Sequence, residues 1–142
     1  MMGSVRVQIN DEGLTISNPG GFVEGITLNN LLTAEPYGRN PLLSDALKRI
    51  GLAERTGRGI DRIFEGSITF GRPWPDYSES TSQNVTLFIA RAKADIPFIQ
   101  MIMDEQKAIG HTLSINTLLI LSILYSERKL SGKELSDKTH IS

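Results

Sequence analysis

The stretch from Arg39 to Phe64 constrains the fold more than any other part of the sequence. Asn40 is a residue type that caps helix N-termini, Pro41 suits the first helical position, and Gly51 suits the left-handed residue that follows a helix. Apolar residues between these signals recur at three- and four-residue spacing, which predicts that one face of this helix is buried. They are Leu42, Leu43, Ala46, Leu47 and Ile50.

Two glycines, Gly57 and Gly59, bracket Arg58 just before a second apolar periodicity begins at Ile60. Backbone N–H groups at such a loop and helix start can bind an anion, which is the geometry of many phosphate sites. The alternative is an ordinary connection between two helices, with the glycines as turn residues. Short glycine motifs often match by chance, so spacing alone favours the ordinary connection.

Two strand patterns joined by a turn signal open the chain. Residues 5–9 alternate apolar and polar side chains, which is typical of a half-buried strand, and residues 14–17 resume the alternation. Residues 11–13, Asp-Glu-Gly, predict the hairpin turn between them. The second strand ends at residues 18–21, Asn-Pro-Gly-Gly, where an α/β sheet presents its ligand edge. A plain turn is the alternative.

The middle of the chain predicts a third strand over residues 85–90, which are almost wholly apolar. Such a strand is expected either at the centre of a sheet or against a covering helix. The helical pattern is expected to weaken after Phe64, at residues 65–67. Trp74, between two prolines, is expected to pack its extended segment onto the core, with stacking on a ligand as the alternative.

The pattern in the last third of the chain predicts three helices. The first covers residues 96–109 and ends at Gly110, the second is capped by Ser114, and the third opens with the capping box Ser131–Glu134. A turn is expected over residues 139–141, and Ser142 suits the N-cap of a further helix. This order is typical of a winged helix-turn-helix, whose recognition helix would follow, so we expect a segment of a longer protein.

Composition excludes several classes of protein. The chain has no cysteine and only two histidines far apart in sequence, so neither thiolate chemistry nor a metal site is expected. No apolar run approaches the roughly 18 residues of a membrane span, and no signal peptide is visible, which predicts a soluble, cytoplasmic protein without a membrane partner. Residues 39–72 hold seven Lys or Arg against four Asp or Glu, a local excess that suits a phosphate-bearing ligand.

Five short sequence words, in a fixed order within residues 5–92, give the chain a family resemblance. It resembles the C-terminal domain of RecG-related, helicase-like transcriptional regulators, which usually follows an AlbA-type, Schlafen-like domain. The words are ISNPGGF (16–22), GIT (25–27), RNPLL (39–43), GLAER (51–55) and GRGI (57–60). No GxxxxGK[ST] phosphate loop is present, so no helicase motor is expected.

The resemblance implies the histidine-kinase and Hsp90-type (GHKL) ATPase fold. The expected architecture is α+β: a two-layer α/β sandwich, partial and GHKL-like, followed by a helical segment that begins a winged helix-turn-helix. Residues 1–92 would form the partial sandwich, residues 93–112 a linker helix, and residues 113–142 the N-terminal part of the winged-helix module, truncated before its recognition helix.

The resemblance also implies two glycine boxes that would contact ATP. Asn18, Gly20 and Gly21 stand at the first box, and Gly57, Arg58 and Gly59 stand at the second. In the fuller pattern an Asp occupies the position of Asn18 and receives the adenine amino group, and a glycine occupies the position of Phe22. An amide accepts one hydrogen bond but lacks the charge. Arg55 and Arg58 would offer charge-assisted contacts to phosphate.

The resemblance places the helix with the Mg²⁺-holding Asn before Val5, outside this sequence. We therefore expect no catalytic residue, no metal ligand and no tightly bound cofactor here, whereas ATP and Mg²⁺ would belong to the full-length protein, as a binder or weak ATPase. An uncovered sheet face would also favour self-association.

Two functional hypotheses follow. The first is a fragment of a DNA-binding transcriptional regulator with an incomplete nucleotide-binding domain, which contacts DNA through the full-length winged helix. The second is a ligand-free structural or dimerisation domain between an N-terminal domain and a winged helix, with a homodimer as its partner state.

Overall fold

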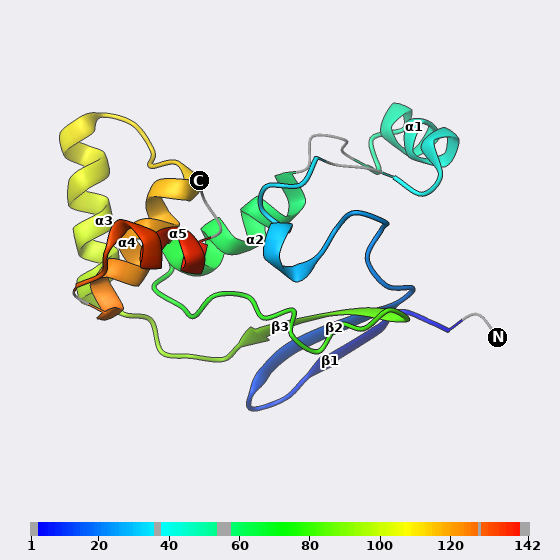
Figure 1. The fold of residues 1–142 in the computed structure, drawn as a ribbon, viewed down its shortest axis with the longest axis horizontal. Coiled ribbons are helices and arrows are strands. Elements are labelled where there is room, and N and C mark those ends of the chain that lie inside the picture. Colours follow the sequence, from blue (N-terminus) through cyan, green and yellow to red (C-terminus); the bar gives the residue numbers. More distant parts are fainter. Residues whose placement is uncertain (1–2, 36–37, 54–57, 128, 140–142) are drawn as a thin grey trace.

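The computed structural model describes residues 3–35, 38–53, 58–127 and 129–139. Three strands form one antiparallel sheet in the order β1-β2-β3, and helices lie along one side of it (Figure 1). The fold is α+β, as the sequence predicts. In chain order the elements are β1 (Arg6–Ile9), β2 (Gly13–Pro19), the 3-10 helix η1 (Leu28–Asn30), α1 (Pro41–Arg49), α2 (Arg58–Thr69), β3 (Asn84–Ala90), α3 (Ile96–Ile109), α4 (Ile115–Glu127) and α5 (Gly132–Thr139).

The predicted hairpin between β1 and β2 is confirmed. Its turn is held by Asn10, whose side-chain Oδ1 accepts hydrogen bonds of 3.0 Å from the backbone N–H groups of Glu12 and Gly13. Gly13 has a second role, because a Cβ there would lie 2.2 Å from the carbonyl oxygen of Ile89 in β3. The close approach of β2 to β3 therefore requires glycine at this position.

The register of the sheet shows which side chains share a face. Val7 pairs with Ile16, and Ile16 pairs in turn with Leu87, so these three side chains lie on the same face. Leu87 is buried, but Val7 remains 62% exposed and Ile9 79% exposed. The half-buried strand predicted for residues 5–9 is therefore wrong in its burial, because the covering helices pack over β3 and leave β1 open.

β3 is an edge strand of the sheet and β2 is the central one, so the central placement of β3 is wrong. The alternative, a strand against a covering helix, is correct: Leu87 shares a core with Phe64 and Ile68 of α2. The free edge of β3 is partly closed by Asp76, whose N–H donates to Phe88 at 2.9 Å and whose carbonyl accepts from Phe88 at 2.8 Å.

The ends of α1 are as predicted. Asn40 Oδ1 accepts from the Leu43 N–H at 3.0 Å, which caps the first turn. At the other end the Leu52 N–H donates to Leu47 and the Gly51 N–H to Lys48, the paired bonds of a Schellman motif. Gly51 has φ +76°, the left-handed conformation that this motif requires.

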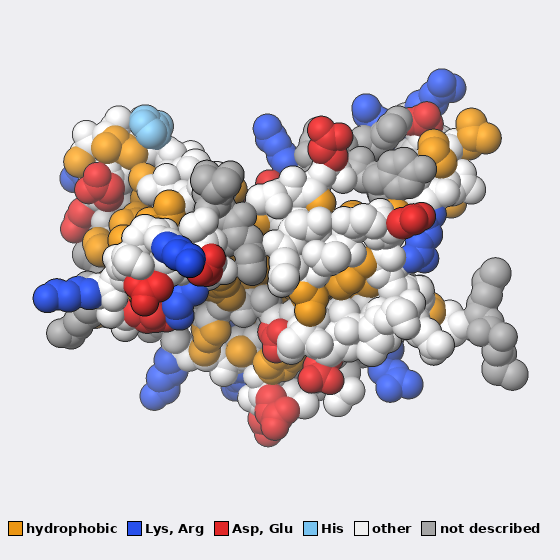
Figure 2. Space-filling view, viewed as in Figure 1, with side chains coloured by type: hydrophobic (Ala, Val, Ile, Leu, Met, Phe, Trp, Pro, Cys, Tyr) orange, Lys and Arg blue, Asp and Glu red, His pale blue; other side chains and the backbone are white. Residues whose placement is uncertain are grey.

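The predicted burial of α1 is wrong. None of its residues is buried, Leu42 is 83% exposed and Ile50 is 67% exposed. α1 lies apart from the sheet and the other helices (Figure 1), and hydrophobic side chains are visible on its surface (Figure 2). Periodicity correctly identifies residues that share a face, but it does not supply an element to cover that face.

α2 is longer than the sequence predicts. The helix continues past Phe64 through the expected weak zone to Thr69. Ile68, one turn beyond Phe64, is only 1% exposed. Burial of this side chain stabilises the last turn against the low helix propensity of Gly66.

One hydrophobic cluster joins the sheet to the C-terminal helices. α2 packs against α4, and α4 packs against α5. The bounds of α3 and its left-handed Gly110 are as predicted, and α5 extends through Thr139, where the sequence predicts a turn. The buried members of the cluster are Phe64, Ile68, Tyr77, Leu87, Phe98, Ile102, Leu118 and Leu119. The domain boundary at residue 92 remains a prediction.

Three capping interactions set the starts of the C-terminal helices. Asp95 Oδ1 accepts from the Phe98 N–H at 3.0 Å, and Ser114 Oγ accepts from the Thr117 N–H at 3.2 Å. Glu134 accepts from the Ser131 N–H at 2.8 Å, which confirms the predicted capping box of α5. The Ser131 hydroxyl also donates to the Glu134 carboxylate at 2.6 Å, and this bond, together with the one from the Ser131 N–H, lowers the pKa of Glu134. Within the described part of the chain, no helix is long and apolar enough to cross a bilayer.

Replacing Ile68 with Ala is expected to lower the free energy of unfolding by about 2–5 kcal/mol, because it leaves a cavity between the sheet and α4. Ile50→Ala removes the same atoms from an exposed site in the matched control, and a change within about 0.5 kcal/mol is expected. Urea unfolding of both variants measures the difference. Equal losses would contradict the burial of α2 and the exposure of α1.

Candidate functional site

The two glycines after β2 both have a backbone reason to be glycine. Gly20 adopts φ +95° and its N–H donates to the Gln83 carbonyl at 2.7 Å. A Cβ on Gly21 would lie 2.5 Å from the carbonyl oxygen of Ser82. The residues 20–21 are thus held against the loop before β3, and the Gly20 N–H is already used within the protein.

Arg39 fixes the other side of this turn. Its Nη2 donates to the carbonyl oxygens of Gly21 and, at 3.3 Å, of Phe22. A Cβ on Gly20 would lie 2.7 Å from Nη1 of the same guanidinium. No pattern in the sequence predicts this contact. Arg39 opens the RNPLL word, but a pairing across 18 residues leaves no local signal.

Asn18 and Phe22, the other two positions of the first predicted box, differ in how they are packed. Asn18 is exposed at the end of β2, and its Nδ2 donates to the Pro19 carbonyl at 3.3 Å. Its Oδ1 has no hydrogen bond to any of the described residues and can accept one from a ligand. Phe22 packs inward on Tyr77, with ring centroids 6.4 Å apart, and burial raises the pKa of Tyr77.

The second predicted box is described only in part. Arg55 and Gly57 lie outside the described residues. Arg58 and Gly59 are the first two residues of α2 and both are exposed. A Cβ on Gly59 would meet no atom within 4 Å, so neither space nor backbone conformation demands glycine there. The first N–H groups of an α-helix have no partner within the helix, which is the general basis of an anion site at a helix start.

The two predicted boxes are not joined by contacts of their own. Among the described residues, no hydrogen bond connects the segment 18–21 with Arg58 or Gly59, and none of these residues lines either cavity described below. In Figure 1 the end of β2 lies at one end of the sheet, whereas α2 starts above its middle. The ligand role of the six predicted residues remains a prediction.

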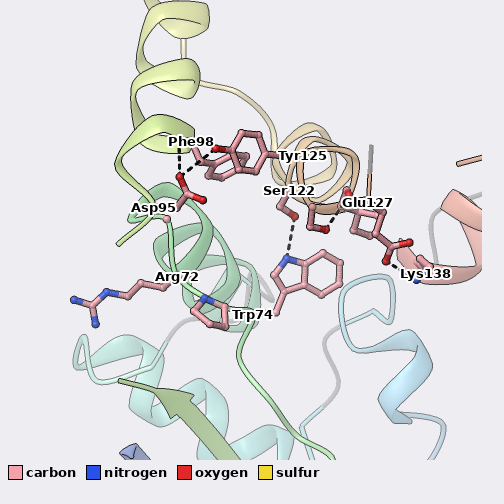
Figure 3. A pocket seen from close by; sticks show the side chains of 12 residues that line it. Arg72, Trp74, Asp95, Phe98, Ser122, Tyr125, Glu127 and Lys138 are labelled. Atoms are coloured by element: carbon pink, nitrogen blue, oxygen red, sulfur yellow. Dashed lines mark hydrogen bonds and ion pairs between the residues drawn. The ribbon is translucent and has the colours of Figure 1, made fainter. Parts of the chain in front are cut away.

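The larger cavity, of about 450 Å³, lies between the segment after α2 and the helices α3, α4 and α5 (Figure 3). Trp74 forms one wall: its Nε1 donates to Ser122 Oγ at 3.0 Å, and its ring meets Phe64 edge-on at 5.9 Å. The predicted packing of Trp74 onto the core is therefore confirmed. A smaller cavity of about 150 Å³, between η1, α2 and α5, shares Trp74.

The larger cavity carries charge as well as aromatic surface. Asp95 Oδ1 accepts from the Tyr125 hydroxyl at 3.2 Å, in addition to its capping bond. Across the cavity, Lys138 Nζ donates to Glu127 Oε1 at 2.6 Å, which ties α5 to the end of α4. Of these positions, only Trp74 is predicted from the sequence. Within the described ranges, no group of three or more His, Asp or Glu side chains is placed to hold a metal ion.

Comparison with known proteins identifies the family. The class that the fold defines is an α+β domain, and the family assignment rests on the sequence. Residues 3–89 match the sequence model of the family described as putative ATP-dependent DNA helicase RecG C-terminal. Because this match covers more than half of the chain, the chain belongs to that family. No curated protein matches it.

A solved structure shares the fold over nearly the whole chain. The crystal structure of the DIP2311 protein from Corynebacterium diphtheriae superposes with a TM-score of 0.78 at 20% sequence identity. The match covers 99% of this chain and 29% of that protein, so the chain spans less than a third of its length. At this identity the likeness concerns the fold, and it includes α3, α4 and α5, which lie beyond the family match.

The glycines of the two boxes are expected to respond differently to alanine. Gly21→Ala should lower the free energy of unfolding by about 1–3 kcal/mol, since the new Cβ overlaps the Ser82 carbonyl. Gly59→Ala is the matched control and should raise it by up to about 1 kcal/mol, since it adds a better helix former in open space. Urea unfolding measures both. A large loss from Gly59→Ala would show that glycine is required at the start of α2.

Proposed function

We propose that the chain is part of a DNA-binding transcriptional regulator of the RecG-related, helicase-like type. In this proposal residues 1–92 form an incomplete, GHKL-like nucleotide-binding unit, residues 93–112 are a linker helix, and residues 113–142 begin a winged helix. Such a regulator works in the cytoplasm, where its DNA is. Membership in the RecG-related family supports the class.

The observation that carries the proposal is the pairing of α4 with α5. α5 packs on α4, begins at a capping box, and is tied to the end of α4 by the Lys138–Glu127 ion pair. In a helix-turn-helix the first helix of the motif crosses the DNA backbone and the next one enters the major groove. α5 corresponds to that first helix, and its exposed Lys133 suits a phosphate backbone.

The nucleotide part of the proposal has partial support. The free Oδ1 of Asn18 suits an adenine amino group, and the start of the 12-residue helix α2, with Arg58 and Gly59, suits phosphate. Against a complete site, the Gly20 N–H is bound to Gln83, and Arg39 occupies the carbonyls of Gly21 and Phe22. Residues of this kind fit ATP only in part, so no hydrolytic step is proposed for this chain.

Duplex DNA should bind to a version of the protein extended beyond Ser142 by about 30 residues, enough for a recognition helix and wing. Its affinity should fall steeply with salt, and Lys133→Gln should reduce the slope of log affinity against log salt by about one unit. Lys107→Gln, on α3, is the control and should leave the slope unchanged. Fluorescence anisotropy of a labelled duplex at several salt concentrations measures this.

Two results would contradict the DNA assignment. Absence of salt-dependent binding by the extended version would exclude DNA as the partner. Tight, sequence-selective binding by the 142 residues alone would show that the reading helix is not the one after Ser142.

A second candidate function is a ligand-free domain that dimerises. The specific observation in its favour is the apolar face that continues from Leu87 across Ile16 to Val7 and then meets solvent. Continuous exposed apolar surface marks an interaction site more often than scattered residues do. A second copy of the chain is the proposed occupant, because one edge of β1 also pairs with none of the residues that the structure describes.

Tests of nucleotide binding and of self-association distinguish the two candidate functions. The regulator proposal predicts that ATP with Mg²⁺ raises the melting temperature of a version extended before Val5 by about 30 residues, and leaves the 142-residue chain unchanged. The second candidate predicts no shift in either, and a dimer that Val7→Lys disrupts while the control Lys48→Gln does not. Thermal melting and sedimentation velocity measure these outcomes. A monomer at all concentrations would exclude the second candidate.

A further inference from the structure

The larger cavity is lined by three aromatic side chains that neither proposed function uses. Phe98 is 5% exposed, and its ring lies 4.9 Å from that of Tyr125 between centroids. Trp74 forms the opposite wall (Figure 3). A space of about 450 Å³ with aromatic walls accommodates a small organic molecule. From its lining and its charges, we propose that this cavity binds a small organic cation, an ammonium or guanidinium group carried on an apolar body.

The negative charge at the cavity selects the sign of the ligand. Asp95 uses Oδ1 for the Phe98 N–H and the Tyr125 hydroxyl, and its Oδ2 has no partner among the described residues. The end of α4 at Glu127 also faces this space, and a helix C-terminus carries partial negative charge. Aromatic faces add attraction for a cation and none for an anion. Three independent features therefore favour positive charge.

The two basic residues of the lining do not reverse this preference. Lys138 is paired with Glu127 at 2.6 Å, so the charges of these two residues offset each other. The Arg72 side chain extends away from the other labelled side chains of the cavity in Figure 3. Arg72 is an exposed residue of the lining.

The cavity lies between two parts of the chain, so a bound ligand would also connect these parts. Residues 71–74 belong to the part of the chain that matches the family, whereas Asp95, Ser122 and Glu127 belong to the helices after it. The Trp74–Ser122 hydrogen bond joins these two parts across the cavity wall. A cation held between Asp95 and Trp74 would add a second connection between them. None of the residues that line this cavity belongs to the glycine boxes.

The single tryptophan of the sequence reports directly on the site. Trp74 emission should change saturably when phenethylammonium is titrated to millimolar concentration into the 142-residue chain, because the ligand contacts the indole. Two probes of matched size carry the test of charge: neutral 2-phenylethanol and the anion 3-phenylpropionate. Both are expected to bind at least about tenfold more weakly, since a hydrogen bond to a charged partner is lost.

Asp95→Asn tests the carboxylate without removing the helix cap, because asparagine caps helices as well as aspartate does. Affinity for phenethylammonium should fall about tenfold while the melting temperature stays close to that of the parent chain. Asp104→Asn, on the outer part of α3 and bound only to Gln100 among the described residues, is the matched control and should leave the affinity unchanged.

Three outcomes would overturn the proposal. One is the absence of any saturable change in Trp74 emission with phenethylammonium. Another is equal affinity for the three probes, which would mean that the cavity does not select charge. The third is an equal effect of Asp95→Asn and Asp104→Asn, which would reduce the role of the carboxylate to general surface charge.

Discussion

The packing of α2 between the sheet and α4 is the interaction on which the rest of the structure depends. Phe64 and Ile68 project from one face of α2 into a core that also contains Leu87 of the sheet and Leu118 and Leu119 of α4. Phe98 and Ile102 of α3 belong to the same buried cluster. Because apolar burial supplies most of the favourable free energy of folding, this core decides where α3, α4 and α5 lie.

Trp74 lies at the edge of the same core and connects the segment after α2 to α4. Its ring packs on Phe64, and its indole N–H reaches Ser122, 48 residues away in sequence. A buried indole needs such a partner, because an unpaired N–H would cost free energy on burial. The segment after α2 is thereby fixed against α4, and the space left beside it is the cavity between Trp74 and Asp95.

The sequence predicts those features whose signals are local. Helix caps at Asn40, Ser114 and Ser131, the hairpin after Asn10 and the left-handed Gly51 all depend on residues within a few positions, and each is present. Ile68 escaped prediction because Gly66 and Ser67 lower local helix propensity, and tertiary burial overrides propensity. The Arg39 and Trp74 contacts span 18 and 48 residues, and no periodicity encodes such pairs.

The same distinction, between local signals and long-range contacts, explains why the sequence predicts the glycine boxes but not the cavity. The glycine boxes are sequence words, and the structure gives Gly20 and Gly21 a packing reason of their own, so their presence in the sequence does not by itself argue for a nucleotide. The cavity is lined by side chains from four separate segments, and no short sequence motif contains them. Glu127 in its lining forms an ion pair with Lys138, and this ion pair connects α5 to α4. Lys138 and Glu127 both line the cavity, so a ligand held by Asp95 and Trp74 would lie in the same space as the interaction that sets α5 against α4, and binding could be coupled to the setting of α5.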